Sequence, residues 1–118
     1  MIETTSVTVG IPVADLEEAI RWYTRLLDAG SDIEPVEGVV EFEVRDGFWL
    51  QLFEGAGGSG EAVIRLGVLD IDAARERLVG IGLEVGEIER IPNVIAFCDL
   101  MDPWGNGLSL YQVLPAAS

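Results

Sequence analysis

The sequence contains no histidine, and this absence removes several kinds of chemistry at once. Serine or cysteine nucleophiles that depend on a histidine base are excluded, and so is a metal centre that needs imidazole ligands. Acid–base chemistry near neutral pH would fall to a perturbed carboxylate, a tyrosine or the cysteine. We therefore assign no catalytic residue from the sequence, and an enzyme is not the favoured class.

Lysine is also absent, so seven arginines are the only basic side chains that balance 21 acidic ones. The resulting net charge of −14 repels nucleic-acid phosphates and anionic membrane surfaces, and neither is an expected partner. The acidity serves solubility or attracts a cationic small molecule, and the sequence leaves both interpretations open.

Cysteine occurs once, at Cys98, so no internal disulfide can form. We expect Cys98 to be a small buried hydrophobe in a reducing compartment. No apolar run approaches the roughly 18 residues that span a bilayer, and the first ten residues show no signal-peptide pattern. The expected location is the cytoplasm. The 118 residues, 49% of them hydrophobic, can form one domain with a real core and without disulfides or a metal.

The order of elements is read from hydrophobic spacing and from turn residues. Residues 6–13 alternate as a half-buried strand, with Val7, Val9, Ile11 and Val13 on one face. Asp15 is placed to cap a helix over residues 16–27. Strands are then expected over residues 32–36, 39–44 and 48–54, the last two joined by a turn at Asp46–Gly47.

The same pattern restarts in the second half of the chain. A strand over residues 62–68 precedes a helix capped by Asp70, and three strands follow over residues 83–87, 94–100 and 108–113. A shift of 55 residues superposes Asp15 on Asp70 and Tyr23 on Leu78. We interpret this as an internal repeat, with module 1 at about residues 1–54, a linker at 55–61 and module 2 at about 62–118.

Two motifs in this order resemble the glyoxalase/bleomycin-resistance/dioxygenase family, also called the vicinal oxygen chelate family. They read PVADLEEAIRWYTRLL, starting at Pro12, and DPWGNGLSL, starting at Asp102. The resemblance covers nearly the whole chain. It implies a single α+β domain of two βαβββ modules, in which mixed sheets curve into a cup and the helices lie on the convex side. It also implies a homodimer with the ligand cavity in the cup.

Enzymes of this family hold a divalent metal with one residue from each of four strands, usually histidines and glutamates. The resemblance places those positions at Thr8, Gln51, Val63 and Ser109. None is a carboxylate or an imidazole, and Val63 has no donor atom, so this set would hold such a metal poorly. We therefore expect no metal and no cofactor, and the similarity is to the metal-free, bleomycin-resistance-like branch.

Strand alternation assigns further side chains to the expected cup. The candidate ligand-binding residues are Thr8, Glu41, Glu43, Trp49, Gln51, Phe53, Arg65, Phe97, Asp99, Ser109 and Tyr111. The aromatic rings would stack on a flat or cationic ligand beside the carboxylates. The alternatives are a core or dimer interface for the rings, a solvated sheet face for Glu41 and Glu43, and a structural ion pair for Arg65. Trp104 lies either at the cavity rim or in an exposed turn.

These observations favour metal-independent binding or sequestration of a small aromatic or cationic molecule, with antibiotic resistance as one form of it. The alternative is a lyase or isomerase of the glyoxalase-like superfamily with an atypical or absent metal site. A third class is an interaction module whose cup is filled by a protein partner. Elemental analysis and ligand titration separate the three.

Overall fold

The computed structural model divides the chain into two compact units, Met1–Gly58 and Ser59–Ser118, and each is described by itself. It describes residues 3, 5–29, 33–55 and 63–116. Residues 56–61 of the expected linker lie outside these ranges. Within the described ranges, neither helix has the length and apolarity needed to cross a bilayer.

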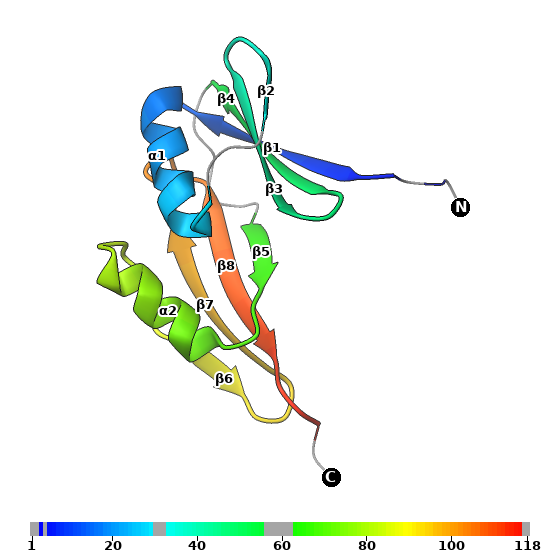
Figure 1. Ribbon diagram of the computed structural model, residues 1–118. Coiled ribbons are helices and arrows are strands. Elements are labelled where there is room, and N and C mark those ends of the chain that lie inside the picture. The colour runs from blue at the N-terminus through cyan, green and yellow to red at the C-terminus, as the bar shows by residue number, and fades with distance from the viewer. Residues whose placement is uncertain (1–2, 4, 30–32, 56–62, 117–118) are drawn as a thin grey trace. The chain divides into compact units, whose positions relative to one another are not determined.

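The first unit contains one helix and four strands (Figure 1). They are β1 (Val7–Val13), α1 (Leu16–Leu27), β2 (Ile33–Val36), β3 (Val39–Arg45) and β4 (Phe48–Glu54). The strand order in the sheet is β1-β4-β3-β2. β1 runs parallel to β4, whereas β3 is antiparallel to both of its neighbours, so the sheet is mixed.

The second unit repeats this topology element by element. It contains β5 (Val63–Gly67), α2 (Ile71–Gly80), β6 (Glu89–Ile91), β7 (Ile95–Met101) and β8 (Gly107–Val113). The strand order is β5-β8-β7-β6, with β5 parallel to β8 and the other pairs antiparallel. The predicted α+β fold of two βαβββ modules is confirmed.

Both helices begin where the sequence predicts, because each is capped by an aspartate. Asp15 accepts a hydrogen bond from the Glu18 backbone N–H at 3.1 Å, and Asp70 accepts one from the Ala73 N–H at 3.1 Å. Each cap satisfies one of the backbone donors that a helix N-terminus leaves without a partner. Acidic residues in the first turn of each helix also suit the positive end of its dipole.

The two helices pack against their sheets with apolar faces of different size. α1 lies over β3 and β4 and buries Ala19, Trp22, Tyr23 and Leu26. α2 lies over β7 and β8 but buries only Ile71 and Leu78 of its described residues.

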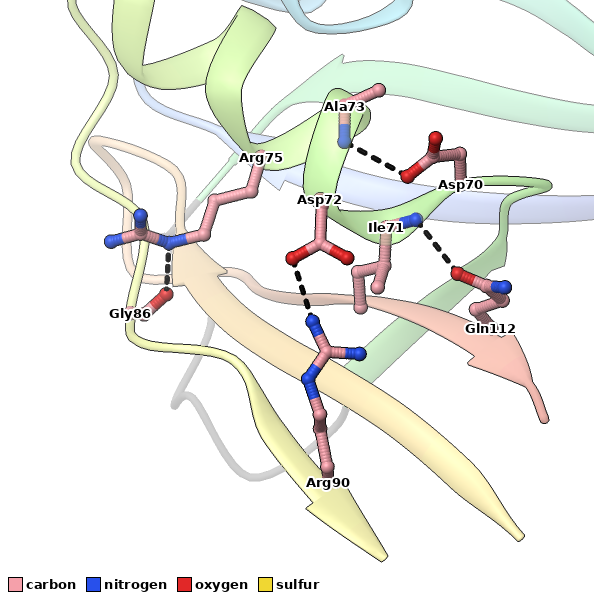
Figure 2. Close-up of polar contacts among 8 residues, drawn as sticks. All are labelled: Asp70, Ile71, Asp72, Ala73, Arg75, Gly86, Arg90 and Gln112. Carbon is pink, nitrogen blue, oxygen red and sulfur yellow. Dashed lines mark hydrogen bonds and ion pairs between the residues drawn. The ribbon is translucent and has the colours of Figure 1, made fainter. Parts of the chain in front are cut away.

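Polar contacts supplement the smaller apolar face of α2 (Figure 2). Gln112 on β8 accepts a hydrogen bond from the Ile71 N–H at 2.9 Å, at the start of the helix. Arg90 on β6 forms an ion pair with Asp72 at 2.6 Å. These contacts tie the first turn of α2 to the inner strand β8 and to the edge strand β6.

The strand predicted over residues 83–87 is wrong, and the reason is visible in the same figure. Arg75 on α2 donates to the Gly86 carbonyl at 2.8 Å (Figure 2). It also donates to the Val85 carbonyl at 3.1 Å. These two carbonyls face the Arg75 side chain, and regular pairing with β7 is seen only from Glu89 onward. One backbone bond, from the Gly86 N–H to the Asp99 carbonyl, still holds this segment against β7, and the strand itself begins at Glu89.

The first strand also departs from its expected burial. Ile11 and Val13 are fully buried, as the alternation predicts, but Val7 and Val9 on the same face are 41% and 38% exposed. Phe48, which lies in register with Val7 on β4, is 52% exposed. The helix therefore covers only one end of this face, and the other end is an exposed apolar patch, which we call the Val7–Val9–Phe48 patch.

Candidate functional site

Each sheet has a helix face and an opposite face, and strand alternation sorts the side chains between them. On β4, Leu50 and Leu52 are buried on the helix face, and Trp49, Gln51 and Phe53 lie half-buried on the opposite face. All residues predicted to bind ligand fall on the opposite face of one sheet or the other. Six lie in the first module: Thr8, Glu41, Glu43, Trp49, Gln51 and Phe53. Five lie in the second module: Arg65, Phe97, Asp99, Ser109 and Tyr111.

A polar row crosses the middle of this face in the first module. Gly10, Gln51 and Glu41 lie in register on β1, β4 and β3. The Gln51 side-chain amide donates to the Glu41 carboxylate at 3.0 Å, and this contact is partly buried. The Gln51 oxygen lies toward Gly10, at 3.9 Å from where a Cβ would stand. Because the Gln51 amide nitrogen donates to Glu41, the amide oxygen remains available as an acceptor.

Aromatic rings flank this row on both sides along β4. Phe53 lies over Gly10, where an added Cβ would stand 3.1 Å from the ring. On the other side, Trp49 lies in register with Thr8 and Glu43. The first module therefore presents two half-buried rings with a carboxylate and an oriented amide between them.

The Glu43 side chain, by contrast, is hydrogen-bonded within its own hairpin. Its carboxylate accepts a hydrogen bond from the Gly47 backbone N–H at 3.2 Å, within the β3–β4 turn. Gly47 has a φ of 78°, a backbone conformation that favours glycine. The structure therefore gives Glu43 a turn-stabilising contact that the sequence did not indicate, and leaves Glu41 as the carboxylate beside Gln51.

The second module carries a corresponding row of different chemistry. Arg65, Ser109 and Asp99 lie in register on β5, β8 and β7, at the positions that match Gly10, Gln51 and Glu41. Ser109 is fully buried, and its hydroxyl has no hydrogen-bond partner among the described residues. Unlike the Gln51 amide, the Ser109 hydroxyl makes no bond to a neighbouring strand among the described residues. This row is therefore not closed by internal hydrogen bonds.

The cation of this row lies over an aromatic ring. The Arg65 guanidinium carbon is 5.4 Å from the centre of the Tyr111 ring, within the range of a cation–π contact. Tyr111 lies over Gly67, where an added Cβ would stand 3.1 Å from the phenol carbon and oxygen. Phe97 lies in register with Tyr111 on β7. Within the described ranges, Arg65 forms no ion pair, so its predicted structural ion pair is not seen there.

The glycines beneath the rings were not singled out from the sequence. Gly10 and Gly67 each stand inside a strand and let a ring from the neighbouring strand lie over the backbone. An isolated glycine in a strand pattern is a known sign of such a close approach. That signal was present at both positions and could have indicated where the rings pack.

The positions that would hold a divalent metal in this family do not fit one here. The Gln51 amide is hydrogen-bonded to Glu41, and the Ser109 hydroxyl and Thr8 hydroxyl are neutral. Among the described residues, no three histidine, cysteine, aspartate or glutamate side chains gather as a metal site requires. Hard divalent cations need several oxygen ligands, usually including carboxylates, so we derive no chemical step through a metal.

Trp104, which the sequence placed at a rim or in a turn, belongs to a well-bonded turn. Its backbone N–H donates to Asp102 at 2.9 Å, and its side chain is half-buried. Asp102 also accepts from the Asn106 backbone at 2.8 Å and from the Asn106 side chain at 2.7 Å. The DPWGNG segment is thus a fixed structural element of the second module.

Similar solved structures share this fold over nearly the whole chain. A glyoxalase/bleomycin resistance protein from Catenulispora acidiphila is 26% identical, with a TM-score of 0.80, over 93% of this chain and 99% of its own. An antibiotic-binding protein, TnmS3, from Streptomyces sp. CB03234 is 24% identical, with a TM-score of 0.77, over 96% and 98%. A lactoylglutathione lyase from Agrobacterium tumefaciens is 17% identical, with a TM-score of 0.75, over 93% and 95%.

No protein-family model matches the chain, and no curated protein matches it significantly. The paired βαβββ modules, each with polar and aromatic side chains on the face opposite its helix, define the class as a glyoxalase-like α+β protein. Together with the similarity to the glyoxalase/bleomycin resistance protein from Catenulispora acidiphila, they support the vicinal oxygen chelate superfamily for this chain.

Proposed function

We propose that this protein binds and sequesters a small aromatic or cationic molecule without a metal, and that it does so in the cytoplasm. The observation that carries the proposal is the Glu41–Gln51 hydrogen bond between the half-buried rings of Trp49 and Phe53. A flat ligand would stack on these rings, and a cationic group on it would lie beside the Glu41 carboxylate. Binding sites for small molecules commonly combine apolar walls with a few oriented polar groups in this way.

The donor chemistry supports a binding role over a metal-assisted reaction. Superfamily chemistry that relies on a Lewis acid needs ligands that Thr8, Gln51 and Ser109 do not provide. TnmS3, one of the structural relatives, is an antibiotic-binding protein. In the resistance form of the proposal, the ligand is an antibiotic, and the protein protects its host by holding the drug rather than by changing it.

Calorimetric titration tests the proposal with planar drugs, cationic glycopeptide drugs and the simple probe 2-naphthylmethylammonium. We expect micromolar binding of at least one planar cation. Trp49→Ala should weaken it about tenfold, because ring stacking in a partly buried site is worth roughly 1 kcal/mol or more. Binding of no probe, together with no survival benefit to a host that expresses the protein, would contradict the proposal.

The Glu41 contribution is tested with a matched pair of charge-neutralising variants. Glu41→Gln should weaken the cationic naphthalene several-fold and leave neutral 2-naphthamide unchanged. Glu84→Gln removes the same charge from an exposed position outside the two rows and should change neither. An equal loss in both variants would show that only the overall charge of the protein matters.

Metal content tests the alternative of a lyase or isomerase. The protein should be purified without chelator and analysed for zinc, nickel, manganese and iron. Stoichiometric metal that survives dialysis would overturn the metal-independent proposal and favour the enzyme. Metal well below one equivalent, with unchanged titration curves after chelator treatment, agrees with binding alone.

A further inference from the structure

The matched rows of the two modules differ in a way that concerns ligand charge. In the first module the carboxylate of Glu41 is bonded by Gln51. In the second module the equivalent row has an arginine, a serine and an aspartate with no hydrogen bond or ion pair between their side chains. A row that joins its own polar groups needs no ligand to satisfy them, whereas the cation and the hydroxyl of the second row have no acceptor among the described residues.

Arg65 is preorganised without being neutralised. Its guanidinium lies over Tyr111 and is exposed. The ring contact restrains the long side chain, while the N–H groups form no hydrogen bond among the described residues. A restrained guanidinium loses less entropy on binding a carboxylate than a free one does. Acidic residues outnumber arginines three to one in this chain. An arginine on this face that forms no ion pair with a described carboxylate is therefore unusual.

Ser109 gives a second, independent sign of a ligand. Its hydroxyl is fully buried and has neither donor nor acceptor within hydrogen-bond distance among the described residues. A buried polar group without a partner destabilises the fold, and such groups in native structures call for an explanation. An anionic oxygen bound by Arg65, which lies in register with Ser109 on the neighbouring strand, would give this hydroxyl its acceptor.

Asp99, at the other end of the row, does not prevent this arrangement. It lies next to Ser109 across one strand spacing, roughly 5 Å, so it repels an anion bound there. Its side chain is exposed, so solvent and salt weaken this repulsion. The Arg65 guanidinium, in direct contact with the anion, outweighs it.

We propose that Arg65 and Ser109 bind an anionic group of the ligand, so that the ligand is an aromatic acid. This inference rests on the proposed function and names its ligand class. The ring of the ligand would stack beside Tyr111 and Phe97, and its carboxylate would bind the Arg65 guanidinium.

Three naphthalene probes of equal size separate this inference from the proposed function. They are 2-naphthoate, neutral 2-naphthamide and 2-naphthylmethylammonium, titrated against the full chain by calorimetry. We expect 2-naphthoate to bind at least several-fold more tightly than 2-naphthamide. Arg65→Gln should weaken 2-naphthoate about tenfold, the loss of one charge-assisted contact, and should change 2-naphthamide by less than twofold.

Arg21→Gln is the matched control, because it removes the same charge from an exposed helix position whose recorded partner is Glu18. It should leave 2-naphthoate binding unchanged. Ser109→Ala provides a second measurement: it should lower the preference for 2-naphthoate without lowering the melting temperature, because the hydroxyl makes no hydrogen bond in the described structure. Circular dichroism confirms that each variant is folded.

The outcomes distinguish the two proposals. If the amide and the ammonium probe bind but 2-naphthoate has no advantage, the anionic-group inference is wrong and the proposed function stands. An equal effect of Arg65→Gln and Arg21→Gln on 2-naphthoate would also overturn the inference, since it would reflect net charge alone. If no naphthalene binds the wild-type protein, both the inference and the aromatic form of the proposed function are wrong.

Discussion

The role of a single side chain in this protein depends more on the groups it contacts than on its residue type. Glu41 and Asp99 occupy equivalent positions on β3 and β7, yet only Glu41 is bonded across its row. The difference lies in the central residue of each row, because the Gln51 amide bonds to Glu41, whereas the Ser109 hydroxyl has no partner among the described residues. Two side chains of similar chemistry therefore differ in how available they are to a ligand.

Asp102 is the carboxylate with the largest predicted effect on stability. It is 3% exposed, and its carboxylate accepts from the Trp104 backbone and from the backbone and side chain of Asn106 in the β7–β8 turn. We predict that Asp102→Ala lowers the free energy of unfolding by about 2 kcal/mol, because it leaves buried donors without an acceptor. Urea unfolding measures this, with the exposed Glu84→Ala as a control that should change stability by less than about 0.5 kcal/mol. Equal effects of the two variants would contradict the structural role of the turn.

Cys98 is buried, and burial raises the pKa of its thiol, an effect that Arg75 partly opposes. The folded state therefore retains the proton at a pH where the unfolded chain has begun to lose it. Stability is unaffected below the ordinary thiol pKa and falls as the pH rises above it. We predict that wild-type protein loses more stability between pH 8 and pH 9.5 than Cys98→Ala does, as measured by urea unfolding. The same loss in both proteins would exclude this contribution.

The two modules share one topology, but their helices are held against the sheets by different kinds of contact. α1 is packed through four buried side chains, whereas α2 is fixed largely by Gln112, Arg90 and Arg75. The polar contacts of α2 also explain the short β6, because Arg75 donates to the carbonyls of Val85 and Gly86, which a longer β6 would include. The pattern of local bonds, not the overall topology, thus determines where each strand begins.

The C-terminal end of α2 offers a matched pair of glycines. Gly80 is the last residue of the helix, and a Cβ added there would meet no atom within 4 Å. We predict that Gly80→Ala stabilises the protein by about 0.5–1 kcal/mol, because alanine loses less backbone entropy in a helix. Gly82 has a φ of 92°, which alanine adopts only with strain, so Gly82→Ala should destabilise by about 1 kcal/mol. Thermal unfolding compares the two; effects of the same sign would contradict the described helix end.

At the scale of the whole molecule, charge and exposed apolar surface oppose each other. The net charge of −14 makes two copies of the chain repel. The Val7–Val9–Phe48 patch lies uncovered on the helix face of the first sheet. Among the described strands, β1 and β5 each have a single partner and lie at sheet edges. Apolar patches and open edges are liabilities that association removes.

We predict that the chain forms a homodimer that tightens as salt is added. Screening shortens the range of the repulsion to about 8 Å at physiological ionic strength, and apolar contact then dominates. Light scattering at micromolar concentration should show twice the 12.8 kDa chain mass. Phe48→Ser should shift the equilibrium toward monomer, whereas Leu69→Ser, at an exposed residue outside the patch, should not. A monomer at both low and high salt would contradict the prediction.

The sequence by itself determined the topology and the faces of the strands. Alternation along the strands placed Leu50 and Leu52 in the core and Gln51 opposite them, because successive side chains point to opposite faces. The caps at Asp15 and Asp70 were also determined locally, since a cap needs only its own first turn. The repeat and the family resemblance depend on the same local patterns.

Only the tertiary structure decided which of these side chains interact. The Glu41–Gln51 bond, the Arg65–Tyr111 contact and the unpartnered Ser109 hydroxyl all depend on strand register, which joins residues far apart in the sequence. The same is true of residues 83–87, whose alternation predicts a strand until Arg75 binds its carbonyls. Local periodicity determines the direction of a side chain, but its partner is set by whichever strand or helix the fold brings beside it.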